Sequence, residues 1–382
     1  MDLSSVRLIA LIDVDPSRGL NLADPQSLAL KTLLGRLSSA GYTFIAPTPE
    51  THARVLDRLD RGHARDVRDV FGWSLPFSAE LLDDELVALM VDAGVLAHEE
   101  EFMRSTVRVA SLADDLFLHS KFPTTQADSV FFGPDTYRFV NFIRENLPKV
   151  QKLGRLVDVG AGSGAGAVAA ARVCKFDRII LTDINPQAIA FARINLAVAG
   201  VRAEFRLGRG LAGLEGPLDL VIANPPFIAD AQNLVYRDGG DLYGARVSLD
   251  WALAGAGALS PSGTVLLYTG AAIIGGEDQF RTALQSNLDP QKFMVTYGEI
   301  DPDIHSETLS SPAYAGVERI AAVGVIITRR RGSSQNPFQH DAKAVKIVES
   351  SLSAWPPQAC FQPQKCPRLW PRAEVSAIGP PS

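Results

Sequence analysis

Three short segments of the sequence carry residue types that could do chemistry, and each follows a short apolar run. The first begins at Asp158 and continues as a glycine loop with Gly160, Gly162 and Gly164. The second is Asp183, and the third is the tetrapeptide Asn224-Pro225-Pro226-Phe227. Glycines let a ligand approach the backbone, carboxylates accept hydrogen bonds from hydroxyl and amino groups, and prolines fix the direction of backbone carbonyls.

The surrounding pattern predicts how these segments are positioned. Short apolar runs are typical of buried parallel strands, and the run before Asp158 leads through the glycine loop into a helix pattern at 165–172. We expect strands near 155–159, 177–182, 202–206, 217–223, 264–269, 292–298 and 319–329. Helices are expected near 164–174, 186–198, 245–259 and 276–287. This alternation predicts an α/β fold with a mainly parallel sheet and helices on both faces.

The glycine loop alone does not determine which cofactor the protein binds. Gly160, Gly162 and Ala165 also satisfy the dinucleotide pattern G-x-G-x-x-G/A. An acid such as Asp183 could bind ribose hydroxyls in an NAD enzyme or in another nucleoside-cofactor enzyme. The later Asn-Pro-Pro-Phe segment favours the second class, because a dehydrogenase has no evident use for it.

Together, these three segments resemble the motifs of class I S-adenosylmethionine (SAM) methyltransferases. More narrowly, they resemble the subgroup with an Asn-Pro-Pro-aromatic motif, which includes HemK-type glutamine methyltransferases, adenine-N6 methyltransferases and guanine-N2 rRNA methyltransferases. The resemblance covers roughly half of the chain, the usual size of one catalytic domain. It implies a Rossmann-like methyltransferase sheet, with its last strand antiparallel and hairpinned onto the one before, and S-adenosyl-L-methionine as cofactor.

The resemblance also implies roles in cofactor binding. The amino-acid end of SAM would lie at the glycine loop and the following helix N-terminus, with Asp158 near its ammonium group. Asp183 would accept hydrogen bonds from the ribose diol, and Ile184 would pack on the adenine. Many relatives carry an acid after the third strand for the adenine amino group, whereas this sequence has Arg209 there.

The Asn-Pro-Pro-Phe motif suits a planar nitrogen, whose delocalised lone pair makes it a poor nucleophile. The Asn224 side-chain oxygen and the Pro225 carbonyl could accept its two N–H bonds and hold it in line with the methyl group. Pro226 would help to fix the backbone, and Phe227 could stack on the planar group. A simple strand-ending turn would also use two prolines.

A further candidate segment precedes the first strand of the sheet. HemK-like enzymes have a Pro-x-x-Thr-Glu segment here that closes over the cofactor, and Pro134 to Thr136 are similar, although Tyr137 replaces the glutamate. We therefore count Thr136 among the cofactor-binding candidates. The alternative is a turn in which Asp135 or Thr136 caps a helix over 137–147.

Other polar groups give weaker signals. The loop 235–244 resembles the segment that borders the acceptor pocket in HemK-like enzymes, so Tyr236 or Arg237 could touch the substrate, or the loop could be an ordinary charged surface. The six histidines show no metal-ligand spacing. Cys360 and Cys366 are expected to be free thiols. We expect no metal.

The pattern of residues 1–120 predicts a helical, winged-helix-like accessory domain. Helices are expected from Asp24-Pro25 to near Gly41, from Thr48-Pro49 onward, over 63–71, and from a cap at Ser78 to near Gly94. Apolar segments at 102–110 and 116–118 suggest a small hairpin after them, while 6–14 could be a strand or an irregular lead-in. Such a module could dock nucleic acid or protein, or serve as a structural lid or dimer surface.

The composition and the remaining chain complete the domain plan. We expect a linker at 121–133, the methyltransferase domain at 134–331 and a disordered tail at 332–382, with one short helix near 342–352. The chain has 382 residues, a net charge of −6 and three cysteines. No apolar run reaches the length of a membrane span, so we expect a cytoplasmic protein with no membrane partner.

The sequence therefore predicts a SAM-dependent N-methyltransferase, with a protein glutamine amide as the favoured acceptor. The acidic balance favours a protein partner, whereas a winged helix would favour a nucleobase amine in RNA or DNA; a small-molecule acceptor is a third option. A SAM-responsive winged-helix regulator is an alternative of another class, but it would have no use for an intact Asn-Pro-Pro-Phe motif.

Overall fold

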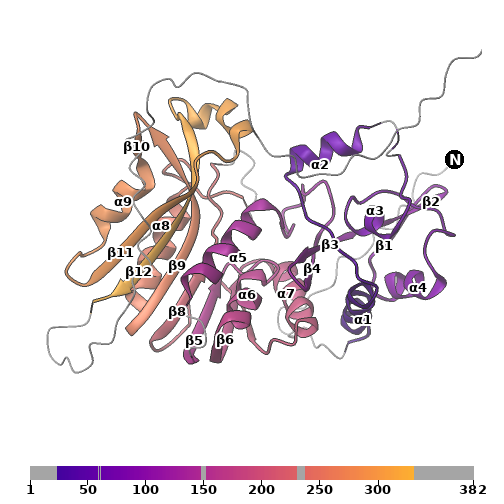
Figure 1. Ribbon diagram of the computed structural model, residues 1–382, viewed down its shortest axis with the longest axis horizontal. Helices are drawn as coiled ribbons and strands as arrows, with labels where there is room; N and C mark the ends of the chain where they lie inside the picture. Colours follow the sequence, from indigo (N-terminus) through magenta and orange to yellow (C-terminus); the bar gives the residue numbers. More distant parts are fainter. Residues whose placement is uncertain (1–23, 59, 61, 148–151, 230–236, 331–382) are drawn as a thin grey trace, which may run out of the picture. The chain divides into compact units, whose positions relative to one another are not determined.

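The computed structural model describes residues 24–58, 60, 62–147, 152–229 and 237–330 (Figure 1). The expectations for 6–14, Tyr236 and the tail with Cys360 and Cys366 lie outside these ranges. The helices are α1 (Pro25–Ser39), α2 (Pro49–Leu56), α3 (Val67–Phe71), α4 (Asp84–Asp92), α5 (Pro134–Asn146), α6 (Ala165–Val173), α7 (Pro186–Val198), α8 (Arg246–Ala258) and α9 (Gln279–Asn287), with 3-10 helices η1 (Ser306–Ser310) and η2 (Pro312–Tyr314). The strands are β1 (Leu96–Glu99), β2 (Phe102–Ser105), β3 (Val107–Leu112), β4 (Asp115–Ser120), β5 (Lys152–Val159), β6 (Lys175–Asp183), β7 (Glu204–Leu207), β8 (Leu218–Ala223), β9 (Leu259–Ile274), β10 (Glu277–Asp278), β11 (Phe293–Asp301) and β12 (Arg319–Arg329).

One large sheet organises the C-terminal part of the described chain. Its strand order is β11-β12-β9-β8-β5-β6-β7, with the short β10 paired to β9. Strands β5 to β9 pair in parallel, whereas β12 is antiparallel to both β9 and β11. The predicted mainly parallel sheet, with an antiparallel last strand hairpinned onto the one before it, is confirmed.

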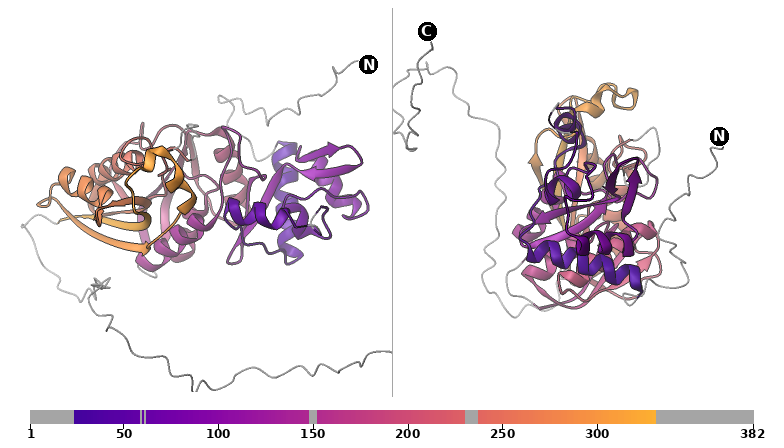
Figure 2. Two further views of the ribbon diagram at one scale, coloured as in Figure 1. Left: turned by 90° about the horizontal axis from the view of Figure 1, so that it is seen from above. Right: turned by 90° about the vertical axis from the view of Figure 1, so that its right-hand side faces the viewer.

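Helices cover both faces of this sheet (Figure 2). Side chains alternate along each strand, so Leu156 of β5 packs with α6 and α7, while the adjacent Val157 packs with α8 and α9. Burial on both faces explains why these strands read as continuous apolar runs in the sequence. The layers also bring the carboxyl ends of β5, β6 and β8 to one edge, where a doubly wound sheet binds its ligands.

The N-terminal segment consists of short helices and two separate antiparallel hairpins, β1–β2 and β3–β4, where a single hairpin was expected. Helices α1 and α2 begin as predicted, each with a capped proline at its start. The prediction of a cap at Ser78 is wrong. Asp83 caps α4 by accepting the Leu86 N–H at 2.8 Å, and Phe77 is held in extended pairing with Met103.

The third predicted helix is also shorter than expected, because Asp66 caps it and it spans only Val67–Phe71. Its winged-helix role stays a prediction. Helices α1, α3 and α4 share one continuous hydrophobic cluster with α5 to α7 of the sheet domain. The buried Asn195 of α7 adds a polar link, because its amide bonds both backbone groups of Leu118 and also the Ser163 carbonyl in the glycine loop.

The proposed division at 121–133 remains a prediction, and the hydrophobic cluster continues across it. Within the ranges described, no helix combines the length and apolar character needed to cross a membrane. The expected cytoplasmic location stays a prediction.

Candidate cofactor and acceptor site

A cavity of about 400 Å³ lies where the predicted site residues converge. Its lining includes, among the predicted residues, Thr136, Asp158, Gly160, Gly162, Asp183, Ile184, Asn224 and Pro226. Gly164, Pro225 and Phe227 are not among the lining residues. Three strand ends, those of β5, β6 and β8, thus contribute to a single cavity, although the roles of the individual side chains stay predictions.

The glycine loop has a backbone shape that demands glycine. Gly160, Gly162 and Gly164 all have positive φ, at +65°, +53° and +78°. A Cβ on Gly160 would also lie 2.5 Å from the ring of Trp251, and one on Gly164 would lie 2.5 Å from Leu196. By contrast, nothing lies within 4 Å of a Cβ on Gly162. The loop therefore combines a required conformation with space for a ligand to approach the backbone.

Asp158 is the most deeply buried acid that lines the cavity, with 2% of its surface exposed. Its Oδ2 accepts the Ala167 N–H of α6 at 2.9 Å. Burial raises the pKa of its carboxyl to about 7; the bond from Ala167 lowers that pKa and the nearby charge of Asp183 adds to the increase. A cationic ligand group in the cavity would therefore favour ionisation of Asp158.

Asp183 ends β6 and holds two backbone groups at once. Its Oδ2 accepts the Gly162 N–H and its Oδ1 accepts the Asn185 N–H, both at 2.9 Å. Burial raises its pKa, against these hydrogen bonds. Because each carboxylate oxygen can accept more than one hydrogen bond, the fixed Asp183 retains capacity for a diol.

Arg209 and Tyr137, the two positions where the sequence departs from related enzymes, differ in their surroundings. Ile184 is 44% exposed at the cavity, and exposed Arg209 lies there with Gly208 and Gly210. Tyr137, which stands where HemK-like enzymes have glutamate, accepts the Ala46 N–H at 3.0 Å instead.

The start of α5 also differs from the expected helix cap. Helix α5 begins at Pro134 with Gly133 as its cap, not at Asp135 or Thr136, because proline suits the first helical position. The Thr136 hydroxyl reaches back to the Gly133 N–H at 3.4 Å.

Asn224 follows β8 directly and lies at the cavity, half-buried. In the described part of the chain, its side-chain amide has no hydrogen-bond partner. The backbone beyond it is firmly held, since the Ile228 N–H bonds the Arg237 carbonyl and the Gly239 N–H bonds the Ile228 carbonyl. The motif therefore presents a polar group to the cavity from a fixed backbone.

The loop after the motif packs too closely for larger residues. A Cβ on Gly239 would lie 1.6 Å from the Gly244 carbonyl oxygen and 2.7 Å from that of Pro226. Asp238 and Gly240 of this loop also line the cavity. Arg237, the described residue of this loop that was predicted to touch the substrate, is not among the lining residues, so its role stays a prediction.

Phe227 lies with its ring among protein groups. It is 7% exposed and packs over Gly270, where an added Cβ would lie 2.4 Å from the ring. Its ring centroid is 6.3 Å from that of Tyr268 and 5.6 Å from that of His305. Its predicted stacking on an acceptor stays a prediction.

Sequence reasoning missed several lining residues. Trp251 and Val247 lie one turn apart on α8, and both reach the cavity. Their i, i+4 spacing was visible, but it is equally typical of core residues. The stretch Ser129 to Phe131 also lines the cavity, although it fell in the expected linker. Across the described ranges, no group of three metal-ligating side chains gathers.

Comparisons with known proteins find similar sequences among methyltransferases. The family model described as Methyltransferase small domain matches residues 138–237. The release factor glutamine methyltransferase of Deinococcus radiodurans is 34% identical over 154 residues, which cover 38% of this chain and 55% of that protein. The ribosomal RNA large subunit methyltransferase G of Streptomyces coelicolor is 37% identical over 120 residues, which cover 30% and 32%. An rRNA methylase structure from Streptococcus thermophilus is 14% identical with a TM-score of 0.35, covering 52% of this chain and 98% of that one.

The sheet order and the family match together define a class. Residues 138–237 match the methyltransferase small domain, and the sheet that contains them has the strand order of a class I methyltransferase fold, which implies S-adenosylmethionine as cofactor. The residues present fit that cofactor, because nothing lies within 4 Å of a Cβ built on Gly162 of the glycine loop, and Asp158 and Asp183 line the same cavity. The chain spans about half the length of the first of these curated relatives and a third of the second.

Proposed function

We propose that the protein is a SAM-dependent N-methyltransferase that acts on a planar nitrogen. The observation that carries this proposal is the shared cavity, in which the glycine loop, Asp158 and Asp183 lie together with the unpartnered amide of Asn224. A cofactor-binding domain without catalysis would need the first three features only. The added amide supplies a place for an acceptor.

The chain's own groups would perform distinct tasks. Bound SAM supplies the electrophilic methyl group. Asp158 would bind the ammonium end and Asp183 the ribose hydroxyls, while Asn224 and the Pro225 carbonyl would accept the two N–H bonds of the acceptor. The nitrogen would form its bond to the methyl carbon as the carbon–sulfur bond breaks, and a proton would leave the nitrogen to water. Fixed hydrogen-bond acceptors favour this transfer because positive charge develops on the nitrogen.

The favoured acceptor is a glutamine amide in a protein. A relative named as a release factor glutamine methyltransferase supports it, as does the net charge of −6, which gives no general attraction to nucleic acid. A nucleobase amine is the alternative, supported by a relative named as an rRNA methyltransferase. A small-molecule acceptor and a SAM-responsive regulator are further alternatives.

Transfer of labelled methyl from SAM into separated protein and RNA fractions of a cell extract tests the proposal. Label in a protein band, mapped to a glutamine, would support the favoured acceptor, and label in RNA would support the nucleobase. The Asn224→Ala protein serves as the control for transfer by this site. Binding of SAM without labelling of either fraction would favour a small-molecule acceptor or the regulator.

A further inference from the structure

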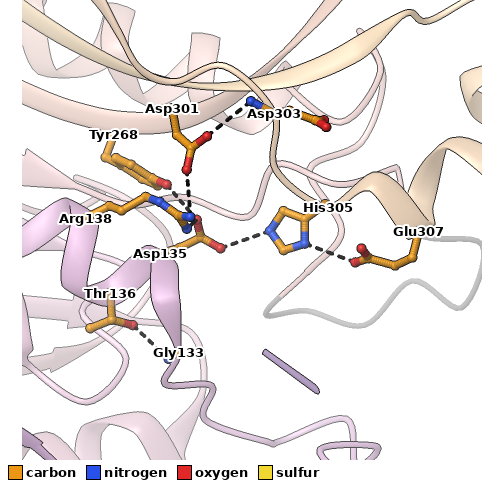
Figure 3. A network of polar contacts seen from close by, with 9 residues as sticks. All are labelled: Gly133, Asp135, Thr136, Arg138, Tyr268, Asp301, Asp303, His305 and Glu307. Atoms are coloured by element: carbon orange, nitrogen blue, oxygen red, sulfur yellow. Dashed lines mark hydrogen bonds and ion pairs between the residues drawn. The ribbon is translucent and has the colours of Figure 1, made fainter. Parts of the chain in front are cut away.

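A polar network beside the acceptor motif is not used by the function proposed above (Figure 3). At its centre is His305, which immediately precedes η1 and has a left-handed backbone with φ of 53°. Its Nε2 lies 2.9 Å from Asp135 Oδ2, and its Nδ1 lies 3.3 Å from Glu307 Oε1. Both ring nitrogens therefore face carboxylates.

Only the imidazolium form can donate to both carboxylates, because a neutral ring has a single N–H. Burial lowers the pKa of His305, but the hydrogen bonds and charges of Asp135 and Glu307 outweigh it and raise the pKa to about 9. The pKa of Glu307 falls because of the His305 bond, and the charge of Arg237 contributes to that decrease. At neutral pH the ring is thus a cation held on both sides.

Asp135 connects this cation to the rest of the fold. Its Oδ1 accepts the Tyr268 hydroxyl of β9 at 2.6 Å and Arg138 Nη1 at 3.3 Å. Arg138 in turn donates to Asp301 at the end of β11 at 2.8 Å. Burial alone would raise the pKa of Asp135, yet its partners, His305 first, lower it. Three separate elements therefore fix this carboxylate.

The network lies between the two halves of the site. The residue after Asp135 is Thr136, which lines the cofactor cavity. On the other side, the His305 ring meets the Phe227 ring at a centroid distance of 5.6 Å and an interplanar angle of 62°. Tyr268 also contacts Phe227, and Gly270 leaves room for its ring. The place of the Phe227 ring thus depends on groups fixed by the network.

We propose that His305, bound between Asp135 and Glu307, is a positioning residue that holds the Phe227 ring of the acceptor motif. This inference rests on the proposed methyltransferase function and adds a residue that no motif contains. His305 acts through Phe227, so its loss should impair use of the acceptor and leave cofactor binding largely intact.

The test compares His305→Gln with the wild-type protein. A glutamine side chain is neutral, and its two N–H donors share one nitrogen, so it cannot place a donor at the positions of both ring nitrogens. At saturating SAM, we expect kcat/KM for the acceptor to fall about tenfold, while the Kd for SAM, measured by calorimetry, stays within about twofold. The matched control is His63→Gln, since exposed His63 also packs on a phenylalanine, Phe102, but lies in the N-terminal segment.

A second variant keeps the test informative if His305→Gln does not fold. Glu307 is 39% exposed, so Glu307→Gln should fold even if His305→Gln does not, and we expect it to lower acceptor kcat/KM about threefold. Unchanged acceptor kinetics in both variants, or an equal loss of SAM affinity, would overturn the positioning role alone. A wild-type protein that binds SAM but labels no protein, RNA or small molecule of the extract would instead refute the proposed function itself.

Discussion

The proposed cofactor side and the proposed acceptor side of the cavity are built in different ways. On the cofactor side, Asp158, the glycine loop and Asp183 belong to one strand–loop–helix–strand unit, and backbone N–H groups hold both acids. On the acceptor side, Asn224 is only one of several residues involved, and they come from distant segments. The motif is supported by the loop at 237–244 and, through Phe227, by side chains from α5, β9 and the segment before η1.

This difference distinguishes a cofactor-binding unit that depends on its own backbone from an acceptor side that depends on distant segments. A unit held by its own backbone can bind the same cofactor whatever surrounds it. An acceptor side assembled from distant segments can change with each of them. Tyr314 of η2 illustrates this, because its hydroxyl accepts the Ala229 N–H at 2.8 Å just after the motif and donates to the Tyr243 carbonyl at 3.2 Å. The two sides should therefore fail separately when single residues are changed.

The largest difference between the effect on kcat and the effect on SAM binding is expected for Asn224→Ala. Removing the amide deletes an acceptor of the substrate N–H bonds while leaving the glycine loop intact, so kcat should fall about 100- to 1,000-fold. The Kd for SAM should stay within about twofold. Radiolabel transfer and calorimetry on one preparation measure both quantities. Exposed Asn287 on α9, which bonds only its own helix, provides the control variant Asn287→Ala. A parallel loss of SAM affinity would contradict the assigned role.

Substitutions in the glycine loop are expected to have the opposite effect and to weaken SAM binding. Gly160→Ala forces a side chain into the left-handed region and against Trp251, whereas Gly162→Ala meets only the backbone strain. That strain costs about 1–2 kcal/mol, so we expect Gly162→Ala to weaken SAM binding about tenfold or less and Gly160→Ala to weaken it more. Calorimetric titration of the two variants measures the difference. Equal Kd values would show that Trp251 moves away without cost.

The cofactor side should also depend on pH through Asp158. Its pKa of about 7 lies above the ordinary value because of burial, so the carboxyl is largely protonated below that pH. A bound ammonium group favours the ionised form, which means that SAM affinity should rise as pH increases from about 5.5 to 7, by up to about tenfold, and then level off. Asp158→Asn should bind more weakly and remove this slope, while Asp183→Asn should keep it. A flat wild-type profile would place the ammonium group elsewhere.

The same contrast explains what the sequence could predict. Helix α7 occupies 186–198 as expected, and β8 and β12 lie within one residue of their predicted bounds, since a capped proline or an apolar run is a local signal. The three chemical segments were visible for the same reason. His305, Tyr268 and Tyr314 gave no comparable signal, because their roles arise only when distant segments meet.

The errors follow from long-range contacts as well. Ser78 has the right residue type for a helix cap, but the pairing of Phe77 with Met103 keeps the chain extended, and Asp83 caps α4 instead. Trp251 could be assigned to the cavity only once α8 was placed beside the glycine loop. Local patterns therefore located the segments after β5, β6 and β8 that line the cavity, whereas the side chains from distant segments around Phe227 carried no local signal.

The smallest effect concerns the cofactor side at Arg209. This exposed residue lines the cavity where many relatives are expected to carry an acid, and a guanidinium group cannot accept a hydrogen bond from an adenine amino group. Arg209→Asp should therefore tighten SAM binding, but only about threefold, because water competes at an exposed position. Arg209→Ala, which removes the cation without adding an acceptor, should change the Kd less. If calorimetry shows that the aspartate variant binds no better than the alanine variant, the adenine lies away from this loop, and the cofactor side departs from its relatives at the base rather than at the ribose.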